Sequence, residues 1–162
     1  MQSTIARTPA RNIASAAVFG LATAGAAWLA SLATSGVSDS EWFRDLEKPA
    51  FYPPDATFSI VWTILYIGVA VAGWLAWRSG GGATTTIPWV IQLVLNLFWS
   101  VLFFGLQEPV WALAEIVLLA LAVTWAAVVF WRYNRWATYL FLPYLAWIVF
   151  AALLNASIVA LN

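Results

Sequence analysis

The sequence predicts an all-α integral membrane protein, in which residues 1–162 form one domain built as a bundle of five transmembrane helices. The first observation is composition, since 64% of the residues are hydrophobic and 9% are charged. Soluble domains typically contain about 45–50% apolar and about 25% charged residues. The second observation is that five apolar stretches reach the length of about 20 residues that a bilayer-spanning helix needs.

The same composition excludes several classes of function. The formal net charge is zero and the chain has no basic run, so we expect no nucleic-acid partner. The chain has no His and no Cys, which are the commonest ligands of zinc, haem iron and most transition metals. We therefore expect no metal site, no intrinsic cofactor and no Ser-His-Asp or Cys-His catalysis.

The first span is predicted at residues 12–35, after a polar and basic start. Ala16, Gly20 and Ala24 recur at four-residue spacing, a pattern that allows close contact between helices and offers a dimer surface. A basic start before an apolar run is also typical of a signal peptide. The length of this run exceeds the roughly 7–15 residues of a signal-peptide core, which favours a retained helix.

Residues 36–56 are predicted to form a structured capping loop. The loop contains five of the seven acidic residues, and Pro49, Pro53 and Pro54 prevent a continuous helix. Its aromatic residues are unusual for a solvated linker and indicate that the loop folds back onto an apolar surface. They are Trp42, Phe43, Phe51 and Tyr52.

The other four spans are predicted at residues 57–77, 87–106, 110–131 and 136–161. Pro88 is expected to open the third span, where a missing N–H is harmless. The second and third spans are separated by a glycine-rich segment, residues 79–82, that is typical of a flexible linker. The turn at 107–109 is very short, so the third and fourth spans must be antiparallel neighbours.

The basic residues predict the orientation, because short cytoplasmic loops carry an excess of Lys and Arg. Five arginines fall on the N-terminal side, and Arg44 and Lys48 fall on the other. We therefore expect a multi-pass protein of the cell (inner) membrane, with the N-terminus in the cytoplasm and the capping loop and C-terminus outside. The five arginines are Arg7, Arg11, Arg78, Arg132 and Arg135.

This orientation sorts the tryptophans by depth. One group lies at the cytoplasmic helix ends and is predicted to form an interfacial aromatic belt: Trp74, Trp77, Trp89, Trp131 and Trp136. A second group lies beneath the capping loop. It consists of Trp62, Trp99 and Trp111 in the outer half and Trp147 near mid-membrane.

Polar side chains lie at the depth of this second group and share helix faces with it. Residues three or four apart lie on one face of a helix, which groups Gln92, Asn96 and Trp99. The same spacing joins Trp62 to Tyr66, Trp111 to Glu115, and Tyr144 to Trp147 and Ala151. Aromatic surface with a few hydrogen-bonding groups is typical of a pocket for a large, flat, mostly apolar ligand.

Two alternatives stay open at this point. Gln92 and Asn96 could instead hydrogen-bond between helices without any ligand, at ~0.6 kcal/mol a pair. Glu115, the one carboxylate well inside a span, could be functional or could simply lie near the outer interface.

Ordered motifs run through nearly the whole chain. They are Trp42 with Lys48-Pro49-x-Phe51-x-Pro53-Pro54, Val61-Trp62-Thr63-x-Leu65-Tyr66, Gln92-Leu93-x-x-Asn96-x-x-Trp99, Phe103-Phe104-Gly105, Trp111-Ala112-Leu113 and Pro143-Tyr144-Leu145-Ala146-Trp147. This series resembles the TspO/MBR family of tryptophan-rich sensory proteins and the mitochondrial translocator protein (peripheral benzodiazepine receptor). Phe51 stands where many members have Trp.

The resemblance implies a five-helix bundle, usually a homodimer, with a pocket closed by the first loop. Members bind porphyrins such as protoporphyrin IX and haem, and synthetic isoquinoline carboxamides and benzodiazepines. Trp62 and Trp147 match the two pocket tryptophans linked to porphyrin handling, and Trp42, Tyr66 and Asn96 match pocket or lid positions. The expected ligand-binding residues are Trp42, Phe51, Pro53, Trp62, Tyr66, Gln92, Asn96, Trp99, Trp111, Tyr144, Trp147 and Ala151.

The resemblance implies a receptor or transporter-like protein with a regulatory or tetrapyrrole-handling role. An alternative is light- and oxygen-dependent porphyrin breakdown, with Trp62 and Trp147 as redox partners. A proton-coupled carrier using Glu115 lacks the paired charges and inverted repeats of such carriers. Residues 156–162 lack the aromatic and basic residues of the family's cholesterol-recognition stretch, so this end gives no support to a sterol site.

Overall fold

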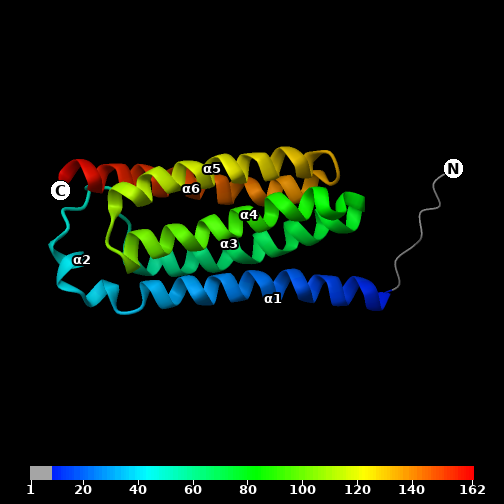
Figure 1. The fold of residues 1–162 in the computed structure, drawn as a ribbon, viewed down its shortest axis with the longest axis horizontal. Helices are drawn as coiled ribbons and strands as arrows, with labels where there is room; N and C mark the ends of the chain where they lie inside the picture. The colour runs from blue at the N-terminus through cyan, green and yellow to red at the C-terminus, as the bar shows by residue number, and fades with distance from the viewer. Residues whose placement is uncertain (1–8) are drawn as a thin grey trace.

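A computed structural model of the protein describes residues 9–162, and within them five long helices lie side by side along the long axis (Figure 1). The helices are α1 (Pro9–Thr34), α3 (Asp55–Ala76), α4 (Gly82–Ser100), α5 (Pro109–Trp131) and α6 (Arg135–Leu161). Short segments join them: η1 (Val37–Asp39), α2 (Glu41–Asp45), η2 (Trp77–Gly81) and η3 (Val101–Gly105). The five-helix membrane bundle predicted from the sequence is therefore confirmed.

Among the described residues, four helical stretches are long and apolar enough to cross a membrane. One of them, Asp55–Gly105, has 51 residues, which at about 1.5 Å per residue would be more than twice the thickness of the hydrocarbon core. The chain reverses inside it at Gly80, where φ is 97°, and Gly82 also has a positive φ of 49°. This stretch therefore forms two spans, and the total is five.

The glycine-rich segment is a tight helical reversal, which corrects the expectation of a flexible linker. Glycine adopts positive φ without steric cost, so two such residues let α3 turn directly into α4. As a result α4 begins at Gly82 and not at residue 87, and Pro88 lies inside the helix instead of opening it.

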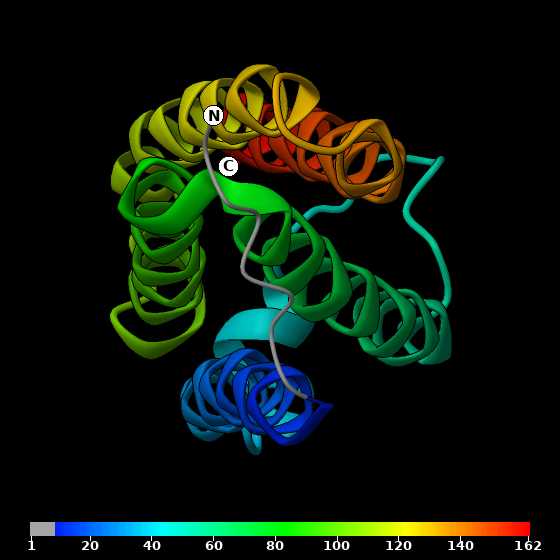
Figure 2. The ribbon, with the colours of Figure 1, turned by 90° about the vertical axis from the view of Figure 1, so that its right-hand side faces the viewer.

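The five long helices form a closed ring (Figure 2). Going round it, α1 contacts α3, α3 contacts α6, α6 contacts α5, α5 contacts α4, and α4 contacts α1. The predicted antiparallel contact between the third and fourth spans is therefore present, as α4 against α5. Because α1 packs on both α3 and α4, it is an integral part of the bundle.

The two ends of the bundle separate the charged segments. The start of α1, the turn η2 and the α5–α6 turn lie at one end (Figure 1). The capping loop, the η3–α5 turn and the C-terminus lie at the other end. The first end therefore carries Arg11, Arg78, Arg132 and Arg135.

Trp89 is a correction to the predicted aromatic belt. Its side chain is 4% exposed, its indole N–H donates to the Val69 carbonyl at 2.9 Å, and its ring packs against Phe19 with centroids 4.6 Å apart. The ring fits because Gly73 on α3 has no side chain, since a Cβ there would lie 2.4 Å from Trp89 Nε1. Trp131 and Trp136 at the same end are exposed, as expected for a belt.

The capping loop lies across the other end of the bundle. Ser40 Oγ accepts a hydrogen bond from the Phe43 N–H at 3.2 Å and so caps α2. Helix α2 directs Trp42 against Phe103 and Phe43 against Phe104, with ring centroids 6.0 and 6.2 Å apart. These contacts hold the loop on an apolar surface formed by η3.

Asn162 fastens the loop to the end of α6. The Glu47 N–H donates to Asn162 Oδ1 at 3.0 Å, and Asn162 Nδ2 donates to the Glu47 carbonyl at 3.1 Å. One side-chain amide thus satisfies both backbone groups of Glu47.

Candidate ligand-binding site

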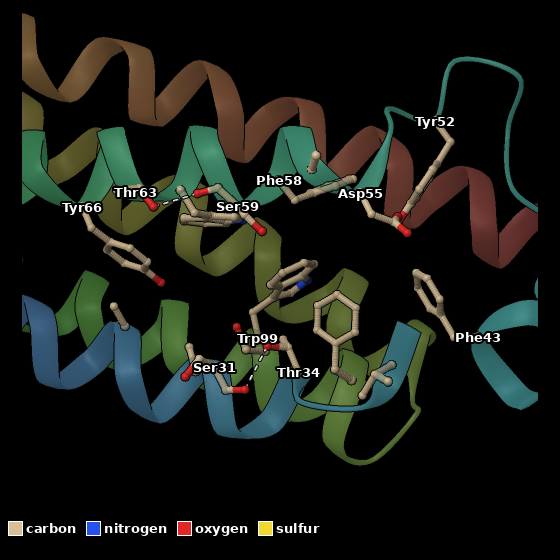
Figure 3. A pocket seen from close by; sticks show the side chains of 17 residues that line it. Ser31, Thr34, Phe43, Tyr52, Asp55, Phe58, Ser59, Thr63, Tyr66 and Trp99 are labelled. Carbon is tan, nitrogen blue, oxygen red and sulfur yellow. Dashed lines mark hydrogen bonds between the residues drawn. The ribbon is translucent and has the colours of Figure 1, made fainter. Parts of the chain in front are cut away.

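A cavity of about 610 Å³ lies beneath the capping loop, between α1, α3 and the end of α4 (Figure 3). We call it the loop-side cavity. Seven aromatic side chains line it, and they come from the loop, α3, α4 and η3. They are Phe43, Tyr52, Phe58, Trp62, Tyr66, Trp99 and Phe104.

The sequence creates this space by setting small side chains opposite large ones. Helix α1 contributes Ala27, Ala30, Ser31 and Thr34, which recur at three- or four-residue spacing and therefore share one face. Helix α3 presents its own face of the same period, which carries Trp62 and Tyr66. Because the α1 side chains are too short to fill the gap, a cavity remains.

Trp62 and Tyr66 form one aromatic surface of the cavity. Their rings are stacked, with centroids 5.3 Å apart and planes 28° apart. The Tyr66 hydroxyl donates to Asn96 Oδ1 at 2.6 Å, which joins α3 to α4. An interhelical hydrogen bond was one of the alternatives for Asn96, and the structure contains it. The bond holds Tyr66, which lines the cavity.

Trp99 lines the cavity from α4. Its indole N–H donates to Asn155 Oδ1 on α6 at 3.3 Å, and Asn155 Nδ2 donates to the Pro109 carbonyl at 2.8 Å. These bonds fix the ring of Trp99 between α4 and α6.

Trp147 and Tyr144 lie behind Trp62 and outside the cavity lining. The rings of Trp62 and Trp147 meet edge to face, with centroids 6.5 Å apart and planes at 89°. Tyr144 contacts Trp62 in the same way at 6.3 Å. The Trp147 indole N–H is buried and has no hydrogen-bond partner among the described residues.

A group of buried polar side chains lies behind this aromatic layer. Gln92, Asn96, Glu115 and Tyr144 are each at most 5% exposed. Within residues 9–162 no partner is found for Gln92 Oε1, Asn96 Nδ2, the Tyr144 hydroxyl or either carboxyl oxygen of Glu115. Glu115 is thus buried inside the bundle. Buried polar atoms normally have partners, so these atoms are candidates for bonds to water or to a ligand.

The remaining predicted site residues do not line the cavity. Trp42 packs on Phe103, and Ala151 is buried in α6. Phe51 is 54% exposed and contacts Phe150, with centroids 6.4 Å apart, and Pro53 is half-buried in the loop. Trp111 is 66% exposed on α5. The structure therefore brings Trp62, Tyr66 and Trp99 to the cavity, with Asn96, Tyr144 and Trp147 behind them.

Sequence reasoning missed the small face of α1 and the hydroxyl-bearing residues of α3. Ser59 and Thr63 line the cavity at four-residue spacing, as do Ala27 and Ser31 on α1. This spacing was visible in the sequence and could have indicated two facing surfaces.

Charged groups lie at the loop end of the cavity. Asp55 lines it beside Tyr52 (Figure 3). Burial, and secondly the negative charge of Asp55, raise the pKa of Tyr52 to about 12. Lys48 lies 4.3 Å from the ring centroid of Phe43 and 5.9 Å from that of Tyr52, and its ammonium donates to the Phe43 carbonyl.

A second hollow of about 410 Å³ lies between α1 and α3, further from the loop. Tyr66 lines both spaces, so its ring stands between them. The row Ala16, Gly20 and Ala24 faces this hollow.

Comparisons with known proteins agree with this arrangement. The family model described as the TspO/MBR family matches residues 17–161. The chain is 40% identical over 123 residues to the tryptophan-rich protein TspO of Archaeoglobus fulgidus, covering 75% of this chain and 80% of the relative. It is 41% identical over 127 residues to the tryptophan-rich protein TspO of Chlorobaculum tepidum, covering 76% and 80%.

The chain is also similar to a mammalian protein. The chain is 35% identical over 119 residues to the translocator protein of Sus scrofa, covering 70% of each chain. The family match covers part or all of each of the five long helices and the whole capping loop, including every residue that lines the loop-side cavity. The chain is a member of the TspO/MBR family.

Proposed function

We propose that this protein is a membrane receptor or transporter-like protein that binds porphyrins, such as protoporphyrin IX and haem, and similar flat hydrophobic ligands in the loop-side cavity. The observation that carries the proposal is the cavity of about 610 Å³ walled by Trp62, Tyr66 and Trp99. Small-molecule sites are usually clefts of about 300–1,000 Å³ with mostly apolar and aromatic walls. The porphyrin is a ligand of the protein and not an intrinsic cofactor.

Stacking supplies the affinity in this proposal. The stacked pair Trp62 and Tyr66 offers one extended aromatic face to a planar ring system. Because Tyr66 is held by Asn96 and Trp99 by Asn155, both surfaces are ordered before the ligand arrives. Ordering before binding lowers the entropic cost of association. A regulatory or tetrapyrrole-handling role is part of this proposal.

The test is an anaerobic titration in the dark of the detergent-purified protein with protoporphyrin IX, followed by porphyrin absorbance and Trp fluorescence. We expect saturable binding that the double substitution Trp62→Phe and Trp147→Phe strongly weakens. Trp136→Phe is the matched control, because Trp136 is 72% exposed at the far end of the bundle. Equal affinities of the double variant and the control would contradict the proposal.

A second candidate function is light- and oxygen-dependent breakdown of the porphyrin. The contact of Trp62 with Trp147, and of Trp147 with Phe58 at 5.7 Å, supports it, because the rings form a continuous aromatic path from the cavity wall. In this scheme the excited pigment and dioxygen supply the oxidising chemistry, and the two tryptophans are one-electron redox partners. Illumination of the porphyrin-saturated wild-type protein in air separates the two functions, since stable absorbance leaves binding alone and protein-dependent bleaching shows breakdown.

The location in the cell is part of the proposal. We place the protein in the cell (inner) membrane, with the N-terminus in the cytoplasm and the capping loop and C-terminus outside. The four arginines at the first end of the bundle, against Arg44 and Lys48 in the loop, support this orientation. The homodimer implied by the family resemblance stays a prediction, which the mass of the purified protein in detergent would test.

A further inference from the structure

The second hollow, between α1 and α3, opens toward the membrane. Ile67 and Val71 line it on α3, and both side chains are exposed on the outer surface of the bundle. Ala24 lines it on α1 and is exposed as well. The outer surface of a transmembrane bundle faces hydrocarbon, so lipid chains have direct access to this hollow.

The side chains that line the hollow offer no free hydrogen-bond donor. Three of them carry a polar hydrogen, and each of these hydrogens is already bonded within the protein. Thr23 donates to a carbonyl of its own helix at 2.9 Å, and the Tyr66 hydroxyl donates to Asn96. The Trp74 indole N–H donates to Ser15 Oγ at 3.1 Å. These bonds favour an apolar occupant.

The shape of the hollow follows two rows of residues at four-residue spacing. They are Ala16, Gly20 and Ala24 on α1, and Tyr66, Ala70 and Trp74 on α3. Each row spans about 12 Å of helix, at about 1.5 Å per residue. Both helices run along the long axis of the bundle (Figure 1), and lipid chains run in nearly the same direction. The hollow is thus an elongated groove, closed at one end by the Tyr66 ring, that suits one extended acyl chain.

Two arginines lie beyond the end of the groove that is opposite Tyr66. Arg78 continues the α3 row by one turn, and its guanidinium lies 4.7 Å from the ring centroid of Trp74. On α1, the hydrogen bond joins Ser15 to Trp74, and Arg11 lies one turn before Ser15. Residues four apart share a helix face, so both arginines follow the groove. Tryptophan is enriched at the level of the lipid headgroups, which is the level that Trp74 indicates here.

No acidic residue in the described part of the chain neutralises these arginines. Five of the seven acidic residues lie in the capping loop, and the other two are Glu108, in the turn before α5, and Glu115. All seven therefore lie in the half of the bundle that carries the loop. The arginine end keeps its positive charge, and a phosphate group is the anion that a membrane supplies there.

We propose that the second hollow binds one acyl chain of an anionic phospholipid, whose headgroup is held by Arg11 and Arg78. A zwitterionic headgroup fits less well, because its own cation is repelled by the two arginines. The small-residue row of α1 then contacts lipid and not a second copy of the chain. This site is separate from the loop-side cavity, and the inference does not depend on porphyrin binding.

The test is native mass spectrometry of the detergent-purified chain, which counts the lipids bound to each chain as lipid is added. Two lipids with identical oleoyl chains are titrated: dioleoylphosphatidylglycerol, which is anionic, and dioleoylphosphatidylcholine, which is zwitterionic. We expect the first molecule of the anionic lipid to bind at least about fivefold more tightly, the factor that one basic residue near a lipid surface gives. Salt should reduce this difference.

The headgroup contact is tested by removing one positive charge at a time. Arg78→Gln and Arg11→Gln should each lower the affinity for the anionic lipid by about fivefold and change that for the zwitterionic lipid much less. Arg132→Gln is the matched control. Arg132 is exposed at the same end, but on the α5–α6 turn, which lies across the ring from α1 (Figure 2). This control should change neither affinity.

The acyl-chain contact is tested by filling the groove. Gly20→Leu should weaken the first binding event of both lipids, because its side chain occupies the hollow. Gly25→Leu is the matched control, since Gly25 is exposed on the same helix and lines neither the hollow nor the loop-side cavity. A Cβ at either glycine meets nothing within 4 Å, so both variants should fold.

Two results would overturn the inference. One is equal affinity of the wild-type chain for the two lipids, which would show that the arginines do not select a headgroup. The other is equal retention of the first lipid by Gly20→Leu and Gly25→Leu. If Gly20→Leu instead converts a dimer mass to a monomer mass and leaves lipid binding unchanged, the hollow is a contact between two copies and the lipid site is wrong. The porphyrin proposal stands in each case, because no porphyrin is present.

Discussion

The hydroxyl of Tyr66 donates a hydrogen bond of 2.6 Å to Oδ1 of Asn96, and this bond joins α3 to α4 at the wall of the loop-side cavity. Asn96 is 2% exposed, so its oxygen could not bond to solvent if the hydrogen bond from Tyr66 were lost. The bond therefore links the order of the cavity wall to the stability of the bundle.

Tyr66→Phe should destabilise the protein and weaken ligand binding. The substitution leaves a buried acceptor without its donor, which costs about 1–3 kcal/mol. The measurement is thermal unfolding in detergent, together with the porphyrin affinity. Tyr139→Phe is the control, since Tyr139 is an exposed tyrosine of α6 that packs on Trp131 and Trp136. Equal melting temperatures of the two variants would contradict the assigned role of the bond.

Gly73→Ala should destabilise the bundle, because its Cβ would lie 2.4 Å from Trp89 Nε1 and Trp89 is buried. Overpacking of this kind typically costs about 1–3 kcal/mol. Gly68 lies on the same helix, and a Cβ there would meet only the Leu140 carbonyl at 3.6 Å, an ordinary contact. Unfolding should therefore occur at lower temperature in Gly73→Ala, and Gly68→Ala should resemble the wild type.

Asn162→Ala should release the capping loop without affecting the helices. It removes the two hydrogen bonds to Glu47, each of which contributes about 0.5–1.5 kcal/mol. We expect faster hydrogen exchange at the backbone amides of residues 41–48 and dissociation of the porphyrin that is about fivefold faster, as ~1 kcal/mol predicts. Ser157→Ala, which removes a bond within α6, is the control. Unchanged exchange in the loop would show that Asn162 does not hold it.

Alkaline pH should loosen the contact between the loop and the end of the cavity beneath it. The pKa of Tyr52 is raised to about 12, above its ordinary value of 10.0, first by burial and then by Asp55. A raised pKa in the folded state means that the neutral phenol stabilises the fold. This contribution is complete below pH 10 and is lost as the pH rises to about 12. Tyrosinate absorbance should contain one component near pH 12 that Tyr52→Phe removes. A spectrum in which Tyr52→Phe removes a component near pH 10 would contradict the burial of this side chain.

The proposed orientation can be tested with single cysteines, because the natural sequence has none. Ala50 is exposed in the capping loop, and Ala83 is exposed at the opposite end beside Gly82. In intact cells, a membrane-impermeant maleimide should label Ala50→Cys at once and Ala83→Cys only after permeabilisation. The opposite labelling would reverse the orientation.

Several features could be predicted from the sequence because they depend on local pattern. Apolar length and the intervening turns indicate five spans, and helical spacing places Trp62 with Tyr66 and Asn96 with Trp99. The position of Trp89 could not be predicted in this way, since depth in the membrane is the same for a belt residue and for a buried one. Its burial depends on Gly73, which lies on another helix.

Rotation of a helix about its axis limited the prediction of the site. Trp111 lies at the predicted depth but on the exposed side of α5, and Trp147 lies behind Trp62 instead of in the cavity wall. Depth comes from position in the sequence, whereas the direction of a side chain depends on which helices are neighbours. In the ring, α5 packs between α4 and α6, and α6 packs between α5 and α3, and these neighbours determine the side to which each tryptophan turns.

The most direct measurement of the proposed binding site compares porphyrin affinity in two cavity-filling variants of α1. Ala27 lines the loop-side cavity, and Ala24, about one turn away, lines the second hollow. If the porphyrin binds in the loop-side cavity, Ala27→Phe should weaken its binding at least about tenfold, the loss that ~1.4 kcal/mol produces, and Ala24→Phe should not. Full affinity in Ala27→Phe, or loss only in Ala24→Phe, would contradict the placement of the ligand beneath the capping loop.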